Sequence, residues 1–344
     1  MTAKNKIIIL RFSAMGDVAM VASVLREFSI QNPHTEMVMV SRASFKPFFD
    51  DIPNLLFHVI HPATIHKGVF GAFRLFKELL NYKPIAIADL HDNLRSRLLS
   101  TFFRFTAVKI VRIDKGRVEK RALTRRHHKI LKPLKLTVER YADVFSVLGF
   151  KLQLNHQLKP MVKEIPPHAL TLFNDKGVKR VGISPFAQHL YKMYPLAKME
   201  KVIAELDALN YQLFIFGGGD EEKSVAENWQ SQFANVKNLI GNFTLTEELA
   251  IISQLNLMLS MDSSGMHMAS LMGIPVISIW GPTHPYAGFL GYGQKLEDCI
   301  QIDHPSRPSS IYGNKPCLCG AVPCIDLIET KVVIQKITER LRND

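Results

Sequence analysis

The sequence has 344 residues, 47% of them hydrophobic, and a formal net charge of +12 because Lys plus Arg (43) exceed Asp plus Glu (31). This length predicts two domains, and the hydrophobic content excludes a largely disordered chain. Every apolar run falls far short of the roughly 20 residues of a membrane span, and the first one stops at Arg11, too early for a signal peptide. We therefore expect a cytoplasmic protein.

In the first half of the chain, short apolar runs alternate with helical patterns. Strands are expected at 6–10, 36–41 and 85–90, and a helix at 18–30, where apolar residues recur at helical spacing. Strands that alternate with helices in this way predict a parallel sheet with right-handed crossovers.

A second round of strands begins near Arg180 with "RVGISPF" and continues through "YQLFIFGGGD", "LNLMLSMDSSG" and "PVISIWGPT". Pro and Gly in the stretch 151–176 indicate a linker, and 331–341 has the pattern of an amphipathic helix. We predict an α/β protein with two Rossmann-like, doubly wound domains that face a central cleft. The predicted divisions are residues 1–160, residues 177–325 and a final helical segment, 326–344.

Positive charge is concentrated in the segment 104–140, which holds thirteen Lys or Arg and three acids. Such a patch commonly faces an anionic partner, namely nucleic acid, a phosphorylated glycan or a lipid surface. The alternative is a solvated helix face with no partner. Under the first interpretation, we expect Arg117, Lys120 and Arg121 to contact the anion.

Two loops have the composition of a ligand site, because ligands of such sheets bind where strands end and helices begin. In "RFSAMGDVAM", the small residues Ser13 and Gly16 precede Asp17 at the predicted first turn of a helix. The second loop, Asp262 to Gly265, comes before a helix expected near Met266. Backbone N–H groups at such a helix start can bind a diphosphate, although Asp and Gly also serve as ordinary caps and turn residues.

Four motifs together resemble glycosyltransferase family 9, the ADP-heptose:lipopolysaccharide heptosyltransferases. They are "RFSAMGDVAM", "DLHDNLRS" at 89–96, "SPFAQHLYKMYP" at 184–195 and "MDSSGMHMASLMGIPVISIWGPTHP" at 261–285. The motifs occur in the family's order over nearly the whole chain.

The resemblance implies a GT-B fold, an acceptor site mainly in the first domain, a nucleotide-sugar site in the second, and inverting transfer with no metal or other cofactor. It implies that Asp17 is the general base and that Lys192 contacts the phosphates. Phe243 and Thr244 would contact the base of the nucleotide, and Glu222, or its neighbour Glu221, would contact the ribose. The remaining nucleotide-sugar contacts expected are Ser184, Asp262, Ser263, Ser264, Gly265 and His267.

Two departures from the family pattern leave the sugar open. Tyr194 precedes Pro195 where Trp is frequent, and Ser263 and Ser264 replace the more usual Thr and Gly. We expect an ADP-sugar donor, with heptose the sugar that the resemblance implies, while another nucleotide-linked sugar stays open.

The acceptor is expected to be an anionic lipid-linked glycan, such as a lipopolysaccharide core, reached at the cytoplasmic face of the inner membrane. Besides Ser13, Gly16 and the basic segment, His91 and Arg95 are candidate acceptor contacts, with ordinary loop structure as the alternative. Two other functions stay open. One is a nucleotide-sugar epimerase of the same fold, and the other is a nucleic-acid-binding protein, although the basic segment lacks a recognisable binding module.

Three of the four cysteines cluster as Cys317, Cys319 and Cys324. In a cytosolic chain, close cysteines indicate zinc or redox chemistry before a disulfide. Their C-x-C-x4-C spacing, with Cys299 distant, matches no standard zinc module well. A structural role without metal is the favoured interpretation, and zinc binding is the alternative.

Overall fold

The computed structural model describes residues 5–173 and 177–342 and divides into two compact units. The first unit runs up to Lys115 and includes 137–155, and the second combines 116–136 with 156–344. The predicted domain limits at residues 160, 177 and 325 remain a proposal. Residues 174–176 of the expected linker, and the outermost residues of the expected first and last segments, lie outside the described ranges.

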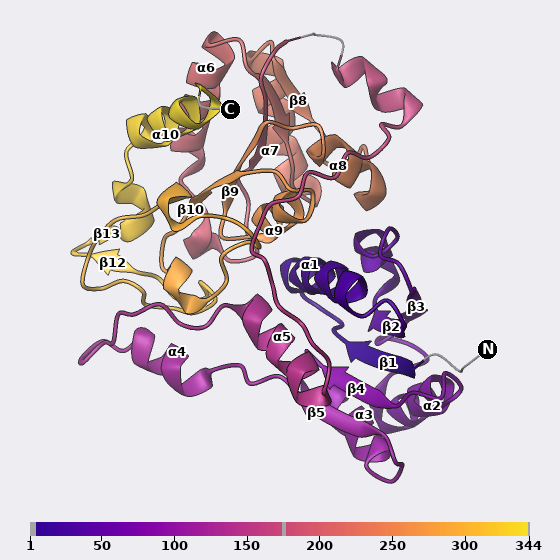
Figure 1. Ribbon diagram of the computed structural model, residues 1–344. Helices are drawn as coiled ribbons and strands as arrows, with labels where there is room; N and C mark the ends of the chain where they lie inside the picture. The colour runs from indigo at the N-terminus through magenta and orange to yellow at the C-terminus, as the bar shows by residue number, and fades with distance from the viewer. Residues whose placement is uncertain (1–4, 174–176, 343–344) are drawn as a thin grey trace. The chain divides into compact units, whose positions relative to one another are not determined.

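The sheet of the first unit has five parallel strands in the order β3-β2-β1-β4-β5 (Figure 1). They are β1 (Asn5–Leu10), β2 (Thr35–Ser41), β3 (Leu55–Val59), β4 (Ala86–Asp89) and β5 (Lys109–Arg112). The inner strands have continuous buried apolar runs, at 7–10, 37–40 and 86–88, because helices cover both faces of the sheet. The strand order reverses between β1 and β4, so the loops after these two strands lie side by side.

Helices cover both faces of this sheet. On one face, the side chains of α2 (Gly68–Leu80) and α3 (Leu94–Phe103) pack on alternate residues of the strands, among them Ile8, Leu10 and Val38. The helices α1 (Met15–Gln31) and α5 (Thr137–Leu148) pack together. Figure 1 shows α1 on the opposite side of the sheet from α2. A doubly wound sheet follows from this arrangement.

The second unit has a parallel sheet of six strands in the order β11-β10-β9-β6-β7-β8. These are β6 (Arg180–Ser184), β7 (Gln212–Ile215), β8 (Val236–Asn238), β9 (Leu257–Met261), β10 (Val276–Ile279) and β11 (Cys299–Ile300). The order reverses between β6 and β9, which brings the loops after Ser184 and Met261 together.

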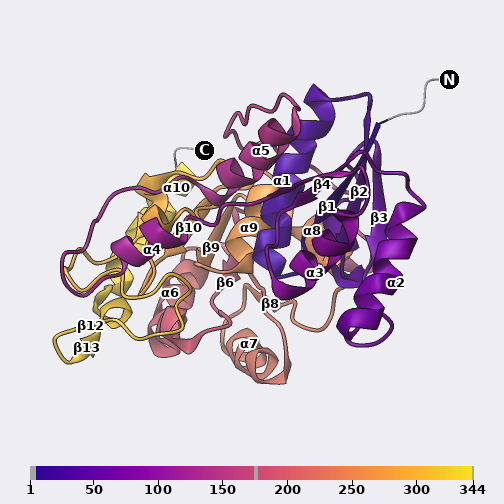
Figure 2. The same cartoon turned by 90° about the horizontal axis from the view of Figure 1, so that it is seen from below.

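Three helices pack on one face of the second sheet. The helices α6 (Leu196–Ala208), α7 (Asp220–Gln232) and α10 (Thr330–Arg342) pack there on residues such as Ile183 and Leu259 (Figure 2). The helices α8 (Leu245–Ile252) and α9 (Ser264–Leu271) contact each other. Shorter elements are α4 (Arg117–Leu123), η1 (Ala43–Phe48), η2 (Pro167–Phe173), η3 (Leu190–Lys192), η4 (Pro285–Ala287), η5 (Leu296–Asp298), β12 (Leu318–Cys319), β13 (Val322–Pro323) and η6 (Cys324–Leu327).

The middle of the basic segment, which we expected in the first domain, is grouped with the second unit. Residues 116–136, which include α4, belong to the second unit. Leu123 and Leu134 form a buried cluster with Ala287, and the backbone N–H of Leu134 donates to the carbonyl of Tyr286 at 2.9 Å. Apolar contacts within the second unit therefore hold this segment, despite its charge.

Among the described residues, no helix combines the length and the apolar character needed to cross a bilayer.

Candidate active site

Asp17 lies in the first turn of α1, directly beyond the carboxyl end of β1. Its Oδ2 is in an ion pair with the guanidinium of Arg11, and its side chain is 25% exposed. Arg11 is itself buried, donates to the carbonyl of Leu90 at 2.8 Å and lies 6.0 Å from the ring of Tyr141. The other carboxylate oxygen of Asp17 has no hydrogen bond to the described part of the chain. Asp17 is thus a fixed and accessible carboxylate at a strand end.

His91 follows β4 and reaches the loop after β1. Its Nδ1 accepts from the backbone N–H of Phe12 at 3.2 Å, and the ring is 8% exposed. Burial lowers the pKa of His91 to about 3, and the positive charges of Arg11 and Lys115 also lower it, while Asp17 raises it. At neutral pH the imidazole is therefore neutral and can serve as a hydrogen-bond donor or acceptor, but it adds no positive charge.

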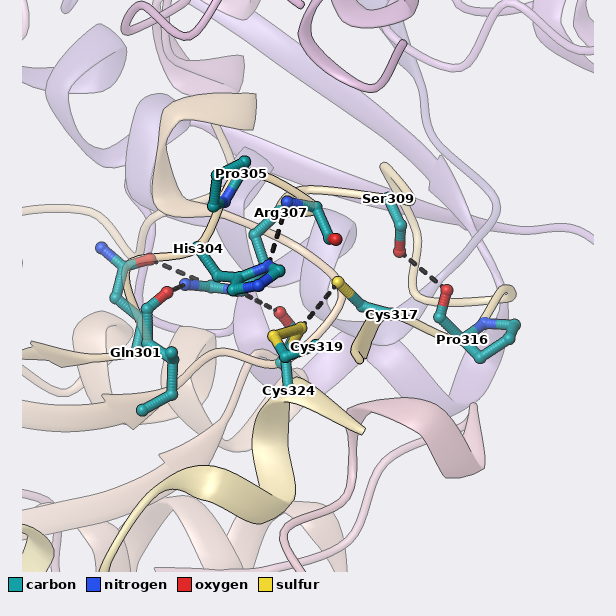
Figure 3. Close-up of a disulfide and its surroundings, with 12 residues drawn as sticks. Gln301, His304, Pro305, Arg307, Ser309, Pro316, Cys317, Cys319 and Cys324 are labelled. Atoms are coloured by element: carbon teal, nitrogen blue, oxygen red, sulfur yellow. Dashed lines mark hydrogen bonds between the residues drawn. A yellow bond between two sulfur atoms is a disulfide. The ribbon is translucent and has the colours of Figure 1, made fainter. Parts of the chain in front are cut away.

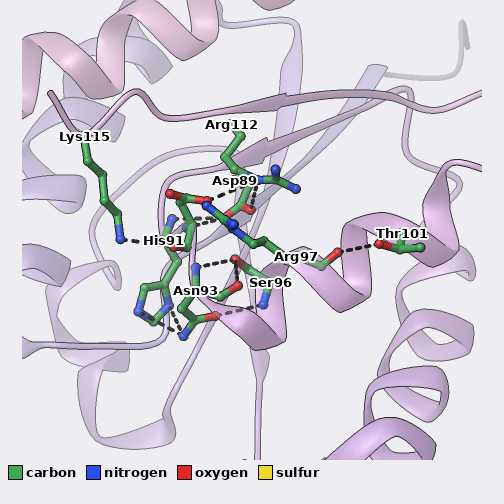
Figure 4. A network of polar contacts seen from close by, with 9 residues as sticks. Asp89, His91, Asn93, Ser96, Arg97, Thr101, Arg112 and Lys115 are labelled. Atoms are coloured by element: carbon green, nitrogen blue, oxygen red, sulfur yellow. Dashed lines mark hydrogen bonds and ion pairs between the residues drawn. The ribbon is translucent and has the colours of Figure 1, made fainter. Parts of the chain in front are cut away.

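Buried carboxylates after β4 form a network with arginines (Figure 4). Asp89 Oδ1 accepts from the backbone N–H groups of His91 (3.1 Å) and Asp92 (2.9 Å), and its Oδ2 lies 3.1 Å from Arg112 Nε. Arg97 Nε contacts Asp92 at 2.7 Å. Because Asp92 is paired in this way and is buried, it is a weaker candidate for the base than Asp17.

The other predicted acceptor residues of the first unit lie in the loops after β1 and β4 or in the first turn of the helix that follows each loop. Their side chains differ in whether they already have a partner in the protein. The guanidinium of Arg95 donates to the carbonyl of Pro62 at 3.1 Å. Gly16 is in the first turn of α1, and Ser13 is in the loop before it. We expect any contact of Ser13 and Gly16 with the acceptor to form from the loop between β1 and α1 and from the first turn of that helix.

In the second unit, the reversal of strand order joins two predicted residues directly. Ser184 ends β6, and Gly265 is the second residue of α9. A Cβ atom on Gly265 would overlap the side chain of Ser184. Only glycine therefore allows α9 to start this close to the end of β6.

The backbone donors of the second loop are fewer than predicted. The N–H of Asp262 donates to the carbonyl of Ile279 at 3.3 Å, and that of Ser263 donates to the carbonyl of Met261 at 2.7 Å. The first-turn amides of α9, beginning with Ser264, have no acceptor within an α-helix. The amides that remain available to an anion at this helix start are therefore those of Ser264, Gly265 and Met266.

Lys192 and Asp262 are paired in this same place. Nζ of Lys192 lies 3.0 Å from Oδ2 of Asp262, and the two side chains are 15% and 8% exposed. A Cβ on Gly313 would overlap the methylene groups of Lys192, so the loop at Gly313 packs against the lysine stem. The ammonium is consequently held beside the start of α9 by a carboxylate and a packed loop.

Burial distinguishes two further residues of this region. His267, in α9, is only 6% exposed, so its side chain is buried and has little surface for a ligand. Tyr194 is fully buried, and its hydroxyl donates to the carbonyl of Ile328 at 2.9 Å. The departure from Trp to Tyr therefore changes a contact in the core of the second unit.

The expected ribose contact belongs to the glycine-rich loop after β7. Oε2 of Glu222, in the first turn of α7, accepts from the backbone N–H of Gly218 at 2.8 Å, whereas Glu221 is exposed. This bond orders the loop and leaves the second carboxylate oxygen, Oε1, without a bond to the chain as described. Of the two candidates, Glu222 is the positioned one.

Phe243 and Thr244 lie at the start of α8. The ring of Phe243 is stacked on His168 with centroids 5.5 Å apart. Thr244 is the N-cap, and forms a reciprocal capping box with Glu247. The backbone and side-chain hydrogen bonds from Thr244 lower the pKa of Glu247. Capping therefore accounts for the Thr244 side chain, and Phe243 offers a flat apolar surface.

The three basic residues singled out in 104–140 are not equivalent. Arg117 and Arg121 are exposed, but Lys120 is buried, with Nζ 4.2 Å from the centroid of the Phe289 ring. The prediction that all three form an anion-binding surface is therefore wrong for Lys120, because a cation–π contact places its ammonium against an aromatic face.

Sequence reasoning missed Arg11, Asp89 and Arg112. Arg11 stands in the quoted motif six residues before Asp17, but only the adjacency of β1 and β4 shows that it is buried between them. Asp89 and Arg112 are paired because β4 and β5 are neighbours with these residues in register. A charged residue at the end of an apolar strand was the available signal.

Comparison with known proteins shows the relationship that these features suggest. The sequence profile described as glycosyltransferase family 9 (heptosyltransferase) matches residues 72–309. Lipopolysaccharide heptosyltransferase 3 of Escherichia coli is 31% identical over 110 residues, 31% of this chain and 32% of that protein. Lipopolysaccharide core heptosyltransferase OpsX of Haemophilus influenzae is 26% identical over 82% of this chain and 81% of its own length.

A solved structure confirms the fold. The structure of the E. coli heptosyltransferase WaaC with ADP has a TM-score of 0.67 and 18% sequence identity, and the likeness covers 97% of this chain and 99% of that one. The α/β architecture with two parallel sheets is thus the GT-B fold, as predicted.

Proposed function

Because the chain belongs to glycosyltransferase family 9 and is therefore a glycosyltransferase, we propose that it transfers heptose from ADP-heptose to an anionic glycan of the lipopolysaccharide core type. Transfer inverts the anomeric centre and requires no metal ion. The observation that carries the proposal is the Lys192–Asp262 pair at the start of α9.

Lys192 and the first turn of α9 supply positive charge of the kind that a leaving diphosphate requires. As the glycosidic bond breaks, charge develops on the diphosphate, and preorganised donors stabilise it without reorganising. The helix start contributes N–H groups and its partial positive charge. The carboxylate of Asp262 orients the ammonium of Lys192 and also neutralises part of its positive charge. We infer that this arrangement replaces the divalent ion that other transferases use.

Asp17 provides the base that the acceptor requires. The hydroxyl oxygen of the acceptor forms the new bond to the anomeric carbon while the bond from that carbon to the diphosphate oxygen breaks. The hydroxyl proton passes to the free oxygen of Asp17, and ADP leaves with the electron pair of the broken bond. A base in this role must lie within hydrogen-bond reach of the hydroxyl, and the exposure of Asp17 supports that requirement.

The alternatives predicted from the sequence are less well supported. The family profile and the curated relatives are those of transferases, which favours transfer over epimerisation and over nucleic-acid binding. The relatives' names also supply the heptose and the lipopolysaccharide core in this proposal.

We extend the proposal to peripheral contact with the cytoplasmic face of the inner membrane. In the first unit, Phe70 is 92% exposed and Phe105 is 87% exposed. Phe70 is in α2 and Phe105 follows the end of α3, and these two helices are neighbours, because Phe73 of α2 and Phe102 of α3 are in contact with centroids 5.5 Å apart. Exposed cations near them in the sequence are Lys67, Arg74, Lys77 and Arg104. Exposed aromatic rings with cations nearby in the chain fit the interface of an anionic bilayer.

A ligand screen tests the donor assignment. Nucleotide binding stabilises the folded state in proportion to occupancy, so the preferred nucleotide raises the melting temperature most. We expect ADP-heptose to exceed UDP-, GDP- and CMP-sugars, and transfer to an acceptor glycan to proceed without added Mg²⁺ or Mn²⁺. A larger shift with another nucleotide, or a rate that depends on either ion, would contradict the proposal. Donor turnover without acceptor would indicate an epimerase.

A further inference from the structure

The three clustered cysteines occupy a small hairpin that the proposed transfer chemistry does not use. The strands β12 and β13 pair Cys319 with Val322, and the N–H of Cys324 donates to the carbonyl of Cys317 at 2.8 Å. Leu318 and Val322 are 48% and 41% exposed. A hairpin of two-residue strands with exposed apolar side chains is marginal by itself. A cross-link or a bound ion is therefore expected to hold it.

Three potential metal ligands meet at this hairpin, and the sulfur of Cys317 lies beside one of them (Figure 3). The structure joins Cys319 and Cys324 as a disulfide. Cys317 Sγ lies 3.0 Å from Cys324 Sγ. A ring nitrogen of His304 and the sulfurs of Cys319 and Cys324 all lie within 4.8 Å of one another. A disulfide accounts for two of these groups. His304 and Cys317 lie beside it, and Nδ1 of His304 accepts from the backbone N–H of Ser306 at 3.1 Å, which leaves Nε2 of the ring for a metal ion.

We propose that, in the reduced chain, the thiolates of Cys317, Cys319 and Cys324 and the imidazole of His304 bind one zinc ion. Three thiolates and one imidazole are a recognised structural zinc set. Bonds of about 2.3 Å from zinc to sulfur place two ligand sulfurs about 3.8 Å apart in a tetrahedron. The disulfide therefore has to be reduced, and Cys317 has to approach the other three groups, for all four to reach one ion. Binding converts up to three thiols to thiolates and releases their protons.

The surroundings suit the charge of such a site. Zinc with three thiolates and a neutral imidazole has a net charge of −1. Nζ of Lys129 donates to the backbone carbonyls of Pro305 and Pro308 at 2.9 and 3.0 Å. Arg307 is 3% exposed, and it donates to the backbone carbonyls of Trp280 and Thr283 at 3.1 and 2.9 Å. Two fixed cations beside the sulfurs would balance the bound thiolates.

The proposed zinc site would also affect the loop between His304 and Cys317, which packs against Lys192. The chain between His304 and Cys317 includes Gly313, whose backbone packs against the stem of Lys192. Cys324 is buried, and Ile325 beside it belongs to the core of the second unit. An ion held by His304 and the three sulfurs would therefore fix both ends of the loop against that core. This consequence rests on the proposed function, whereas metal binding does not.

Metal content tests the proposal independently of activity. The full chain is purified with a non-thiol reductant and without chelator, and zinc is measured by elemental mass spectrometry. We expect one zinc per chain, and cobalt substitution should give the intense tetrahedral and thiolate charge-transfer absorption. Replacing a residue that only hydrogen-bonds a metal ligand lowers metal affinity by about 10- to 100-fold. Cys317→Ser and His304→Ala each remove a ligand and should therefore lower zinc affinity by more than that.

Cys299→Ser is the matched control, because Cys299 lies outside the cluster with its sulfur near Ser278. It should retain the full zinc content. A reduced wild-type chain without stoichiometric metal would overturn the proposal. So would Cys317→Ser and His304→Ala variants that keep wild-type zinc, since the disulfide interpretation needs neither residue. Iron in place of zinc would overturn the assignment of the metal.

Discussion

Nζ of Lys192 lies 3.0 Å from Oδ2 of Asp262, one residue before the N-cap of α9. Because Asp262 is buried, an unpaired carboxylate there would destabilise the fold, and the ammonium of Lys192 neutralises it. The same ion pair fixes the ammonium where a diphosphate would approach the start of α9. The pair therefore links the stability of this loop to donor binding, and the two effects can be separated by mutation.

We expect Lys192→Gln to weaken ADP-heptose binding by about 10- to 100-fold, the loss typical of a hydrogen bond to a charged group. It should also lower the melting temperature, because Asp262 is left unpaired in a buried position. Isothermal titration and thermal unfolding measure the two effects.

The double variant Lys192→Gln/Asp262→Asn distinguishes direct phosphate contact from neutralisation of Asp262. With both charges removed, most of the lost stability should return while donor affinity stays low. Recovery of wild-type affinity in the double variant would show that Lys192 acts only on Asp262.

The basic segment should affect acceptor binding through its exposed members. Arg117→Ala/Arg121→Ala should weaken acceptor binding, more so at low salt, because exposed charges act through screened attraction, and donor affinity should change little. Lys120→Ala instead removes a buried cation–π contact and should mainly lower the melting temperature. Equal losses of donor and acceptor affinity in the Arg double variant would contradict this division.

Loss of the aromatic surface should reduce membrane binding. Phe70→Ser/Phe105→Ser should decrease co-sedimentation with vesicles that contain anionic lipid, while transfer to a soluble acceptor fragment is retained. Val162→Ser is the control, since Val162 is 81% exposed in the second unit. If both variants bound vesicles like the wild type, the membrane surface would lie elsewhere.

Acid should destabilise the first unit through His91. Its pKa is about 3 in the folded protein and about 6.5 in an unfolded chain, so the unfolded chain binds the proton first as pH falls. The stability that depends on neutral His91 is complete above about pH 6.5 and is lost as the pH falls toward 3.

Urea unfolding at several pH values checks this expectation. The stability difference between wild type and His91→Gln should shrink from pH 7 to pH 4. A His91→Gln difference that is the same at both pH values would contradict the assignment.

Periodic segments could be predicted from the sequence, and long-range placements could not. The strand at 36–41 was recognisable as a short continuous apolar run and the helix of residues 331–341 by apolar residues at helical spacing, and they are observed as β2 and α10. Asp17 and the loop at Asp262 could be singled out as candidates because ligand loops follow strands in doubly wound sheets, and the structure places both directly after strands.

Features that depend on tertiary neighbours were mispredicted or missed. The segment 116–136 has no strand pattern, and its place is decided by contacts of Leu123 and Leu134 with Ala287. The burial of Lys120 depends on Phe289, and the role of Arg11 depends on the adjacency of β1 and β4. His304 stands thirteen residues before Cys317, in a loop whose course the sequence does not reveal.

The turnover of Asp17→Asn tests the central claim most directly. Asn keeps the size of the side chain and can still occupy the first turn of α1, so folding and ADP-heptose affinity should stay close to wild type. Asp50→Asn, which alters a more exposed carboxylate of the same unit, is the matched control and should retain full turnover. Loss of a general base should lower the turnover of Asp17→Asn by about 10²- to 10⁴-fold. If the variant kept more than about a tenth of wild-type turnover, well outside that range, Asp17 would not be the base.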